Sequence, residues 1–300
     1  MSIQLVKCEN PFDIPSAFGD IMGAGEYDVF RFHDDCVYDA GKSYNTYKIT
    51  ANGKSFVLKK YEYPEDYESE VRQYSLLRGL PVPNLLCAAD GCILMDYVEG
   101  DDMKNATDEG VRAAAQSLAE VMNAYPMGRD YETGRYDTYI KRLERRASCL
   151  KNEPEIERAF GVFLQRQRTI PLTLSNSDLL PINVLFDGRR AVIIDWSFGG
   201  FMPYALDIAR FFAHTTPNGE VTSFRMSDCQ KKLFVELVYN GLEIKPDRDT
   251  FDRDILLAEL NELVEILEYY FNDPGAERGN VFELYYPAAK RLASVILSSL

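Results

Sequence analysis

Hydrophobic and β-branched residues come in short runs through the first hundred residues, which predicts a strand-rich segment. The runs at 47–51 and 55–61 flank Asn52-Gly53, a dipeptide typical of tight hairpin turns. Between 65 and 78, aromatic and aliphatic residues recur every three or four positions, which predicts one helix. The apolar run 92–97 predicts another strand. The first third of the chain therefore reads as strands with one helix.

After residue 100 the helical period takes over. Thr107 is a suitable N-cap for a helix that runs to about Ala124. Two apolar runs, 184–186 and 191–194, predict one β-hairpin inside this helical part. Further helices are predicted near 136–150, 154–167, 204–214, 226–240, 249–271 and 285–299. The pattern predicts an α+β fold with two lobes, a small antiparallel β-rich lobe over 1–95 and a larger, mainly helical lobe over 96–300.

Composition narrows the classes of partner. The net charge of −14 would repel nucleic acid, whose binding needs a dense basic face. No apolar run approaches the ~18 residues of a membrane helix, and the first residues lack the apolar stretch of a signal peptide. The six cysteines form no zinc pattern, so free thiols in the cytoplasm are expected. We expect a small-molecule ligand, with no nucleic acid, no membrane and no obligate protein partner.

Candidate chemistry is concentrated around the second hairpin. If its loop comprises residues 187–190, Asn183 lies opposite Ile194, beside Asp195, and Asp178 lies in a loop at the same end. A two-residue turn would pair Asn183 with Val192 and move Asp195 roughly 10 Å further along the strand. Carboxylate and amide oxygens suit Mg²⁺. A shared magnesium site therefore predicts the longer loop.

The spacing of these residues is typical of kinases. An Asp, an Asn five residues later and an Asp after a hairpin can orient an attacking hydroxyl and hold the metal. Taken singly, Asp178 and Asn183 could be turn formers and Asp195 a strand-end cap. The combination around apolar strands favours the chemical site.

The first hairpin supplies a candidate phosphate-binding lysine. Its turn places Lys59 opposite Thr46, beneath a small polar loop that could fold over phosphates. Glu70 on the following helix can neutralise Lys59. The alternative is that Lys59 and Lys60 are solvated side chains on an edge strand. The loop alone is a weak signal, because it matches no glycine-rich phosphate motif; its candidate contacts are Gly41, Ser43 and Asn45.

From about residue 40 to 267 the chain resembles the aminoglycoside phosphotransferase and choline kinase superfamily, the small-molecule relatives of protein kinases. The resemblance is carried by residues 178–185 (DLLPINVL), 194–196 (IDW) and 206–209 (LDIA). The helix with Glu70 and the connector 94–100 are also similar. The resemblance implies a protein-kinase-like fold that binds ATP (or GTP) and Mg²⁺ in the cleft between its lobes.

The same resemblance implies roles for the hairpin residues. Asp178 would be the catalytic carboxylate, and Asn183 and Asp195 the magnesium ligands. Asp207 would brace the catalytic loop. The chain departs from the family where His-Gly or His-Asn usually precedes the catalytic Asp, because Asn176-Ser177 stands there.

For the nucleotide, the resemblance implies that Lys59 with Glu70 holds the phosphates. The backbone near Asp96 and Val98 would bind the adenine edge.

The sequence indicates the phosphate acceptor less clearly than it indicates phosphoryl transfer. The region around Ile244–Asp247 and Ile255–Leu260 resembles the C-terminal part of aminoglycoside 3′-phosphotransferases, which places Glu259 at the substrate. Glu262, three residues further on, is the second candidate for a substrate contact. We expect transfer of a γ-phosphate to a hydroxyl of a small cationic molecule, such as an aminoglycoside or amino sugar. The acidic residues could instead form a solvent-facing stripe.

Two other functions stay open. A choline or ethanolamine kinase would enclose its ligand with aromatic residues, for which the candidates are Tyr269, Tyr270, Tyr285 and Tyr286. A nucleotide-binding pseudokinase is suggested only by Asn176-Ser177.

Overall fold

The chain divides into two compact units, residues 1–100 and 101–300. Asp96, next to the predicted boundary, is bonded within the first unit: its backbone N–H donates to Asn84 O (3.1 Å), and Asn84 Nδ2 donates to Asp96 Oδ2 (2.6 Å). The computed structural model describes residues 4–8, 13–23, 26–34, 42–219, 224–273 and 275–299.

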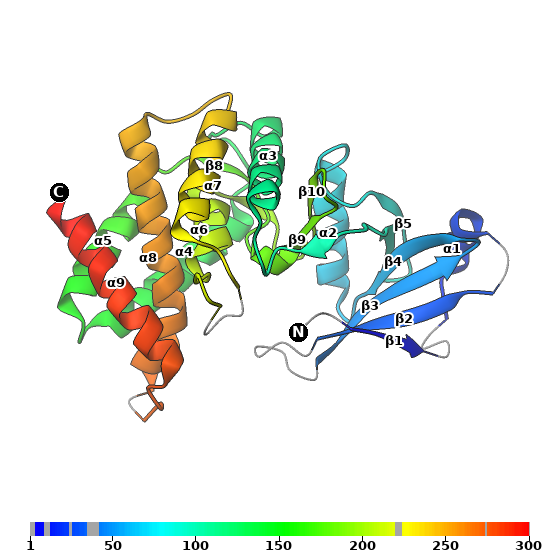
Figure 1. Ribbon diagram of the computed structural model, residues 1–300, viewed down its shortest axis with the longest axis horizontal. Coiled ribbons are helices and arrows are strands. Elements are labelled where there is room, and N and C mark those ends of the chain that lie inside the picture. Colours follow the sequence, from blue (N-terminus) through cyan, green and yellow to red (C-terminus); the bar gives the residue numbers. More distant parts are fainter. Residues whose placement is uncertain are drawn as a thin grey trace. The chain divides into compact units, whose positions relative to one another are not determined.

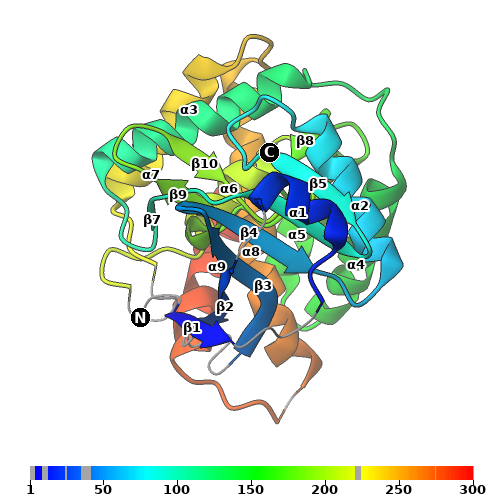
Figure 2. The same ribbon diagram turned by 90° about the vertical axis from the view of Figure 1, so that its right-hand side faces the viewer.

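The first unit is built on a six-stranded antiparallel sheet with the order β1-β2-β3-β4-β6-β5. Helices α1 (Ser16–Met22) and α2 (Pro64–Leu76) both pack against β5 (Figure 2). The prediction of one helix was therefore wrong; α1 is too short for a helical period to emerge. The strands are β1 (Gln4–Cys8), β2 (Asp28–Asp34), β3 (Lys42–Ala51), β4 (Lys54–Lys60), β5 (Leu85–Ala89) and β6 (Cys92–Asp96).

The hairpin of β3 and β4 has the predicted register. Lys59 pairs with Thr46. Asn52 and Gly53 both have positive φ angles, 51° and 75°, as the tight hairpin turn requires. Ile49 and Leu58 of this hairpin are fully buried in the core of the unit. The register and the core together determine which face of β4 carries Lys59.

The second unit is mainly helical. Helices α8 and α9 pack along one another, and α5 contacts both (Figure 1). Thr107 caps α3 as predicted, since its Oγ1 accepts from Gly110 N at 3.1 Å. The last helix begins earlier than predicted and continues through Pro287. The helices are α3 (Asp108–Ala124), α4 (Gly134–Ala147), α5 (Pro154–Gln167), α6 (Ala205–Ala213), α7 (Asp228–Gly241), α8 (Arg248–Asn272) and α9 (Asn280–Ser298), with short 3-10 turns at η1 (Ser148–Leu150) and η2 (Pro181–Asn183).

The hairpin of β9 (Val184–Phe186) and β10 (Ala191–Ile193) has the longer loop. Val184 pairs with Ile193, and Ile194 N donates to Asn183 O at 2.9 Å. The prediction of a single hairpin in this unit was incomplete. A short strand β7 (Asp101–Asp102) joins β9, and β8 (Leu172–Ser175) pairs with β11 (Gly200–Pro203).

The described residues include no helix with the length and apolarity needed to cross a membrane. The cysteines within the described ranges are free thiols, namely Cys8, Cys87, Cys92, Cys149 and Cys229.

A buried ion pair holds α5 against α8. Asp254 on α8 is almost fully buried and accepts from Arg166 Nε (2.7 Å) and Nη2 (2.8 Å). Tyr204 donates its hydroxyl to the same carboxylate at 2.8 Å. The pair therefore joins two helices to the turn before α6, the helix that carries Asp207.

We expect Arg166→Met to lower the free energy of unfolding by about 3–5 kcal/mol, because it leaves the Asp254 charge buried with only a hydroxyl partner. The exposed pair of Arg248 with Asp252 supplies a matched control, since Arg248→Met should cost about 1 kcal/mol or less. Urea denaturation measures both losses. Equal losses would mean that burial of Asp254 does not govern the cost.

Candidate active site

Helix α6 supports the loop between β8 and η2 through hydrogen bonds. Asp207 is buried, and its two carboxylate oxygens accept from the backbone N–H groups of Asn176 (2.7 Å) and Ser177 (2.9 Å). Burial raises the pKa of Asp207 to about 6, although these backbone hydrogen bonds oppose the rise. The expected contact of Asp207 with the loop is therefore confirmed, and it orients the peptide units that lead into Asp178.

Asn176 ties the loop to the end of β10. Its side chain is fully buried; Nδ2 donates to the backbone oxygens of Asp195 (2.9 Å) and Ile194 (3.2 Å). Its Oδ1 accepts from Asp178 N at 3.2 Å. One amide side chain thus connects the backbone of Asp178 with that of Asp195.

Ser177 occupies a backbone conformation that glycine adopts more easily. Its φ is 65°, in the left-handed region that costs an L-residue about 1–2 kcal/mol. Ser175 Oγ accepts from Ser177 N at 3.0 Å. Glycine would adopt this conformation at lower cost, and this chain accommodates serine there with a local hydrogen bond.

Asp178, Asn183 and Asp195 lie together at the end of the β9–β10 hairpin. Asn183 Nδ2 donates to Asp178 O (2.7 Å) and lies 3.4 Å from Asp178 Oδ2. The negative charge of Asp195 helps to raise the pKa of Asp178. Asp195 itself is exposed and has a positive φ of 53°, directly after the strand. This juxtaposition is the one that the longer hairpin loop predicted.

The oxygen donors at this site fit a magnesium ion. Asn183 Nδ2 is engaged by Asp178 O, so Oδ1 is the atom of that amide left for a cation. The exposed carboxylate of Asp195 supplies a charged donor beside it. Hard oxygen ligands of this kind suit Mg²⁺, which keeps water or phosphate oxygens as its other ligands. Within the described ranges, no group of three or more His, Cys, Asp and Glu side chains is arranged to hold a metal ion.

Arg210 is the residue that sequence reasoning missed. It lies on α6 and donates from Nη2 (2.8 Å) and Nε (3.2 Å) to Asp178 Oδ1. Its Nη1 donates to Glu262 Oε2 at 2.6 Å, and Glu265 lies 3.6 Å away. Its spacing of three residues from Asp207 was the available signal, because residues at that spacing share a helix face.

Burial and neighbouring charges have opposing effects on the pKa values around Arg210. Burial and nearby carboxylates raise the pKa of Asp178, whereas Arg210 opposes the rise. Burial would also raise the pKa of Glu262, but Arg210 and His214 outweigh it and hold that pKa at about 2. The pKa of Arg210 lies above its ordinary value in spite of burial, because Glu262 and its other acidic neighbours stabilise the guanidinium. The result is a buried chain of charges that ends at Asp178.

The two glutamates predicted for the substrate occupy different places. Glu262 is almost fully buried between Arg210 and His214 Nε2 (3.2 Å). Glu259 is only partly buried and lines a cavity. The solvent-stripe alternative is wrong for Glu262, and also for Glu268, which pairs at 3.0 Å with the buried Arg146.

In the first unit, the predicted ion pair is present. Lys59 Nζ lies 2.7 Å from Oε2 of Glu70, whose side chain is 1% exposed. Asn45 Oδ1 accepts from Arg31 Nη2 at 3.0 Å. The backbone of Ser43 lies in β3, paired with His33.

Three predicted nucleotide contacts have less structural support. Gly41 lies outside the described residues. Asp96 directs its backbone N–H to Asn84 O (3.1 Å), and Val98 is half-buried after the end of β6. Their roles stay predictions.

The antiparallel N-terminal sheet and the mainly helical second unit define a protein-kinase-like fold. The chain belongs to the phosphotransferase enzyme family (APH), whose model matches residues 36–235. It is a small-molecule phosphotransferase of that family. A search of curated proteins gave no match.

The solved structures that share this fold have names that indicate different phosphate acceptors. The choline kinase LicA from Streptococcus pneumoniae is 13% identical, with a TM-score of 0.59 and coverage of 93% of this chain and 96% of LicA. A putative aminoglycoside phosphotransferase from Ralstonia eutropha is 16% identical (TM-score 0.57; coverage 93% and 95%). A Plasmodium vivax ethanolamine kinase is 14% identical (TM-score 0.55; coverage 85% and 80%). These likenesses show the fold and leave the acceptor open.

We expect Arg210→Met to destabilise the protein by about 3–5 kcal/mol near neutral pH, because Glu262 loses its main counter-charge. In the wild type, the pKa of Glu262 in the folded protein lies below its ordinary 4.5. The stability that the pair of Arg210 and Glu262 contributes is therefore present above pH 4.5 and is lost as the pH falls toward 2. In the variant, only His214 still opposes the effect of burial, so the pKa of Glu262 rises and protonation relieves the cost. The deficit relative to wild type should therefore shrink on acidification to about pH 4.

Chemical denaturation at several pH values measures this deficit. Arg158→Met, on the exposed face of α5, serves as the control and should show a small, constant effect. A deficit for Arg210→Met that grows on acidification would contradict the charge assignment.

Proposed function

We propose that the protein transfers the γ-phosphoryl group of ATP to a hydroxyl of a small amine-bearing molecule, of the amino sugar or aminoglycoside kind. The observation that supports this most strongly is the position of Asp178, held by Arg210 beside Asn183 and Asp195. Arg210 restrains one oxygen of the Asp178 carboxylate, and an acid and an amide lie beside it. This arrangement suits phosphoryl transfer, in which positioning and charge neutralisation supply most of the catalysis.

Asp178 would orient the acceptor. Arg210 engages Oδ1 twice, so Oδ2 is the oxygen available to a substrate hydroxyl. The hydroxyl would donate to Oδ2 and pass its proton there as the new O–P bond forms. Burial raises the pKa of Asp178, which makes the carboxylate a better proton acceptor, while the positive charge of Arg210 favours its ionised form.

Asn183 and Asp195 would hold Mg²⁺ through the amide Oδ1 and the carboxylate. When bound, the ion would supply positive charge to the phosphate oxygens of the nucleotide. Asn176 would keep the two halves of this site in register, since it connects the backbones of Asp178 and Asp195. This bracing supports an active kinase over a pseudokinase, because it replaces the contact that the Asn176-Ser177 departure put in question.

The nucleotide would be held by the first unit. Lys59, kept in place by Glu70, would contact the phosphates, and the loop with Gly41, Ser43 and Asn45 would cover them. The backbone near residues 96–98 would meet the adenine edge. A structure of LicA in complex with AMP, 14% identical to this chain, supports a nucleotide ligand.

The tyrosines offer little support for a choline-type aromatic cage. Tyr269 is 64% exposed, and Tyr270 packs edge-on against Phe282. The hydroxyl of Tyr286 donates to Glu153 (2.8 Å). Tyr285 alone of the four lines the cavity that contains Glu259. This arrangement favours recognition of an amine by a carboxylate.

Asp178→Asn should lower kcat by about 10²–10⁴-fold, because the amide cannot accept the proton. Asp195→Asn should also lower activity and raise the magnesium concentration needed for half-maximal rate. ATP consumption over a panel of hydroxylated amines measures both. Asp252→Asn, an exposed acid on α8, is the matched control and should keep wild-type turnover. Unchanged turnover in Asp178→Asn would refute the assignment.

Lys59→Met should weaken ATP binding by about tenfold or more, the equivalent of one charge-assisted hydrogen bond. Lys60→Met is the matched control, because Lys60 is the next residue on β4 and points to the other face. Calorimetric titration with ATP, and with GTP in parallel, measures affinity and nucleotide preference. Thermal unfolding without nucleotide checks that the variants fold, and equal affinities in the two folded variants would exclude Lys59 from the phosphate site.

A further inference from the structure

Three polar residues follow one another along one face of α6, at spacings of three and four residues: Asp207, Arg210 and His214. Asp207 holds the backbone before Asp178, and Arg210 holds the Asp178 carboxylate. The proposed function assigns no role to His214, which directly follows the helix and is almost fully buried. Its hydrogen bonds indicate one.

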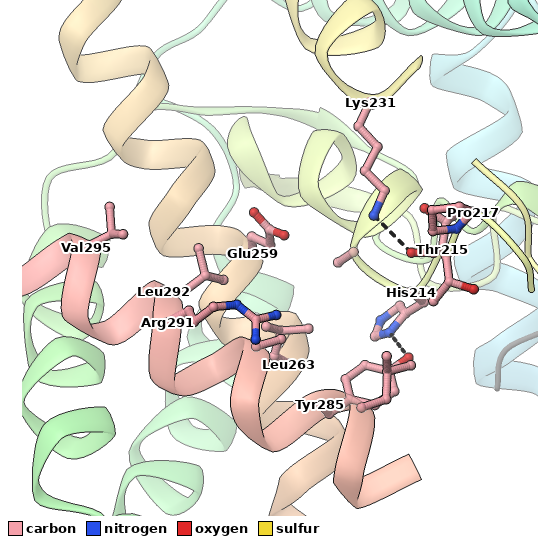
Figure 3. A pocket seen from close by; sticks show the side chains of 14 residues that line it. His214, Thr215, Pro217, Lys231, Glu259, Leu263, Tyr285, Arg291, Leu292 and Val295 are labelled. Carbon is pink, nitrogen blue, oxygen red and sulfur yellow. Dashed lines mark hydrogen bonds between the residues drawn. The ribbon is translucent and has the colours of Figure 1, made fainter. Parts of the chain in front are cut away.

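His214 contacts one side chain on α8 and one on α9. Its Nε2 lies 3.2 Å from Glu262 Oε2, and its Nδ1 lies 3.0 Å from the hydroxyl oxygen of Tyr285 (Figure 3). Against the effect of burial, Arg210 and His214 hold the pKa of Glu262 at about 2, so this carboxylate is ionised near neutral pH and only accepts hydrogen bonds. Nε2 therefore carries a hydrogen and donates it to Glu262, and in the neutral imidazole Nδ1 accepts from Tyr285.

The oxygen of Glu262 that accepts from His214 also accepts from Arg210. Nη1 of Arg210 lies 2.6 Å from Oε2, and Nε and Nη2 of the same guanidinium donate to Asp178 Oδ1. A continuous hydrogen-bond chain thus leads from Tyr285 through His214, Glu262 and Arg210 to Asp178. Tyr285, His214 and Glu262 are almost fully buried, so water does not readily replace a lost contact in this part of the chain.

We propose that His214 is a positioning residue for Asp178 that acts through Glu262 and Arg210. The second hydrogen bond to Oε2 restrains rotation of the Glu262 carboxylate. A fixed Glu262 sets the plane of the guanidinium, and the guanidinium sets the direction in which Asp178 Oδ2 meets the acceptor hydroxyl. This inference rests on the proposed function, and it makes Glu262 a support of Arg210 in place of the substrate contact that the sequence predicted.

Kinetics test this role. Since a misplacement of about 1 Å can lower a rate about 100-fold, His214→Ala should lower kcat about 10- to 100-fold and leave KM for ATP and for the acceptor within about twofold. His214→Gln should retain most of the activity, because its amide nitrogen can replace Nε2 as the donor to Glu262. An acceptor KM that rises while kcat stays at the wild-type value would mean that this region contacts the substrate, and would overturn the positioning role.

Leu292→Ala is the matched control. Leu292 lies on α9 and lines the same cavity as His214, and its side chain offers only apolar packing. The variant should lower thermal stability and keep wild-type kcat. Thermal unfolding of every variant confirms that it is folded at the temperature of the assays.

A measurement without turnover follows the chain directly. The sequence contains two histidines, so ¹⁵N-labelled histidine gives two sets of ring signals in NMR spectra, and His33→Gln assigns those of His214. The hydrogen should reside on Nε2. The Nε–H signal of Arg210, assigned with Arg210→Lys, should exchange with solvent about tenfold faster in His214→Ala, as expected for one lost hydrogen bond to a charged group. It should exchange at the wild-type rate in His214→Gln and Leu292→Ala.

The outer end of the chain borders a cavity of about 350 Å³, which Lys231, Glu259 and Arg291 also line (Figure 3). In His214→Ala this cavity adjoins the place of the lost ring, so free imidazole can enter and should restore both kcat and slow exchange at Arg210. Thiophene, a five-membered ring without a hydrogen-bond donor, should restore neither. Equal rescue by the two compounds would show that the ring only fills space, which overturns the proposal.

Failure of this inference is distinguishable from failure of the proposed function. If Arg210 exchanges at the wild-type rate in His214→Ala, the inference is overturned, whether or not the wild type phosphorylates an acceptor. If exchange becomes faster as expected and no hydroxylated amine of the panel is phosphorylated in an Asp178-dependent manner, the proposed function fails and the coupling of His214 to Arg210 stands.

Discussion

The candidate catalytic centre depends on one shared cation. Arg210 bonds Asp178 with one edge of its guanidinium and Glu262 with another. A half-buried carboxylate beside Asp195 would otherwise meet like charge and lose solvation at the same time. The fixed fork of the arginine balances both effects and orients Asp178, which a flexible lysine could not do as well.

The network also explains why α8 carries acids that look like a surface stripe. Glu262 and Glu268 face arginines of α6 and α4, and Asn261 accepts from Arg146 Nη1 at 2.6 Å. These contacts tie the long helix to the elements that support the loop before Asp178. Stability and site geometry are therefore coupled in this unit, so variants in the network need a folding control before any effect on activity is interpreted.

At Asn176-Ser177, where the chain departs from the family pattern, different contacts hold the loop before Asp178 in place. Asn176 reaches the backbone of Asp195, and Asp207 receives both loop N–H groups. Ser177 accepts a left-handed conformation, with a local hydrogen bond from its N–H to Ser175 Oγ. The loop thus keeps a defined path into Asp178 without the usual residues.

The sequence by itself determined the register of the first hairpin and the pairing of Lys59 with Thr46, because turn residues and strand alternation are local signals. For the second hairpin it left two loop lengths open, and only the expectation of a shared magnesium site selected the register that groups Asp178, Asn183 and Asp195. It also indicated the Lys59–Glu70 pair through the helix that follows β4. Only the tertiary structure revealed the place of Arg210, the burial of Glu262 and the gathering of Lys231, Glu259 and Arg291, since these come from helices far apart in the chain. Helical periodicity shows which residues share a face, whereas the partner of that face is decided by how the helices pack.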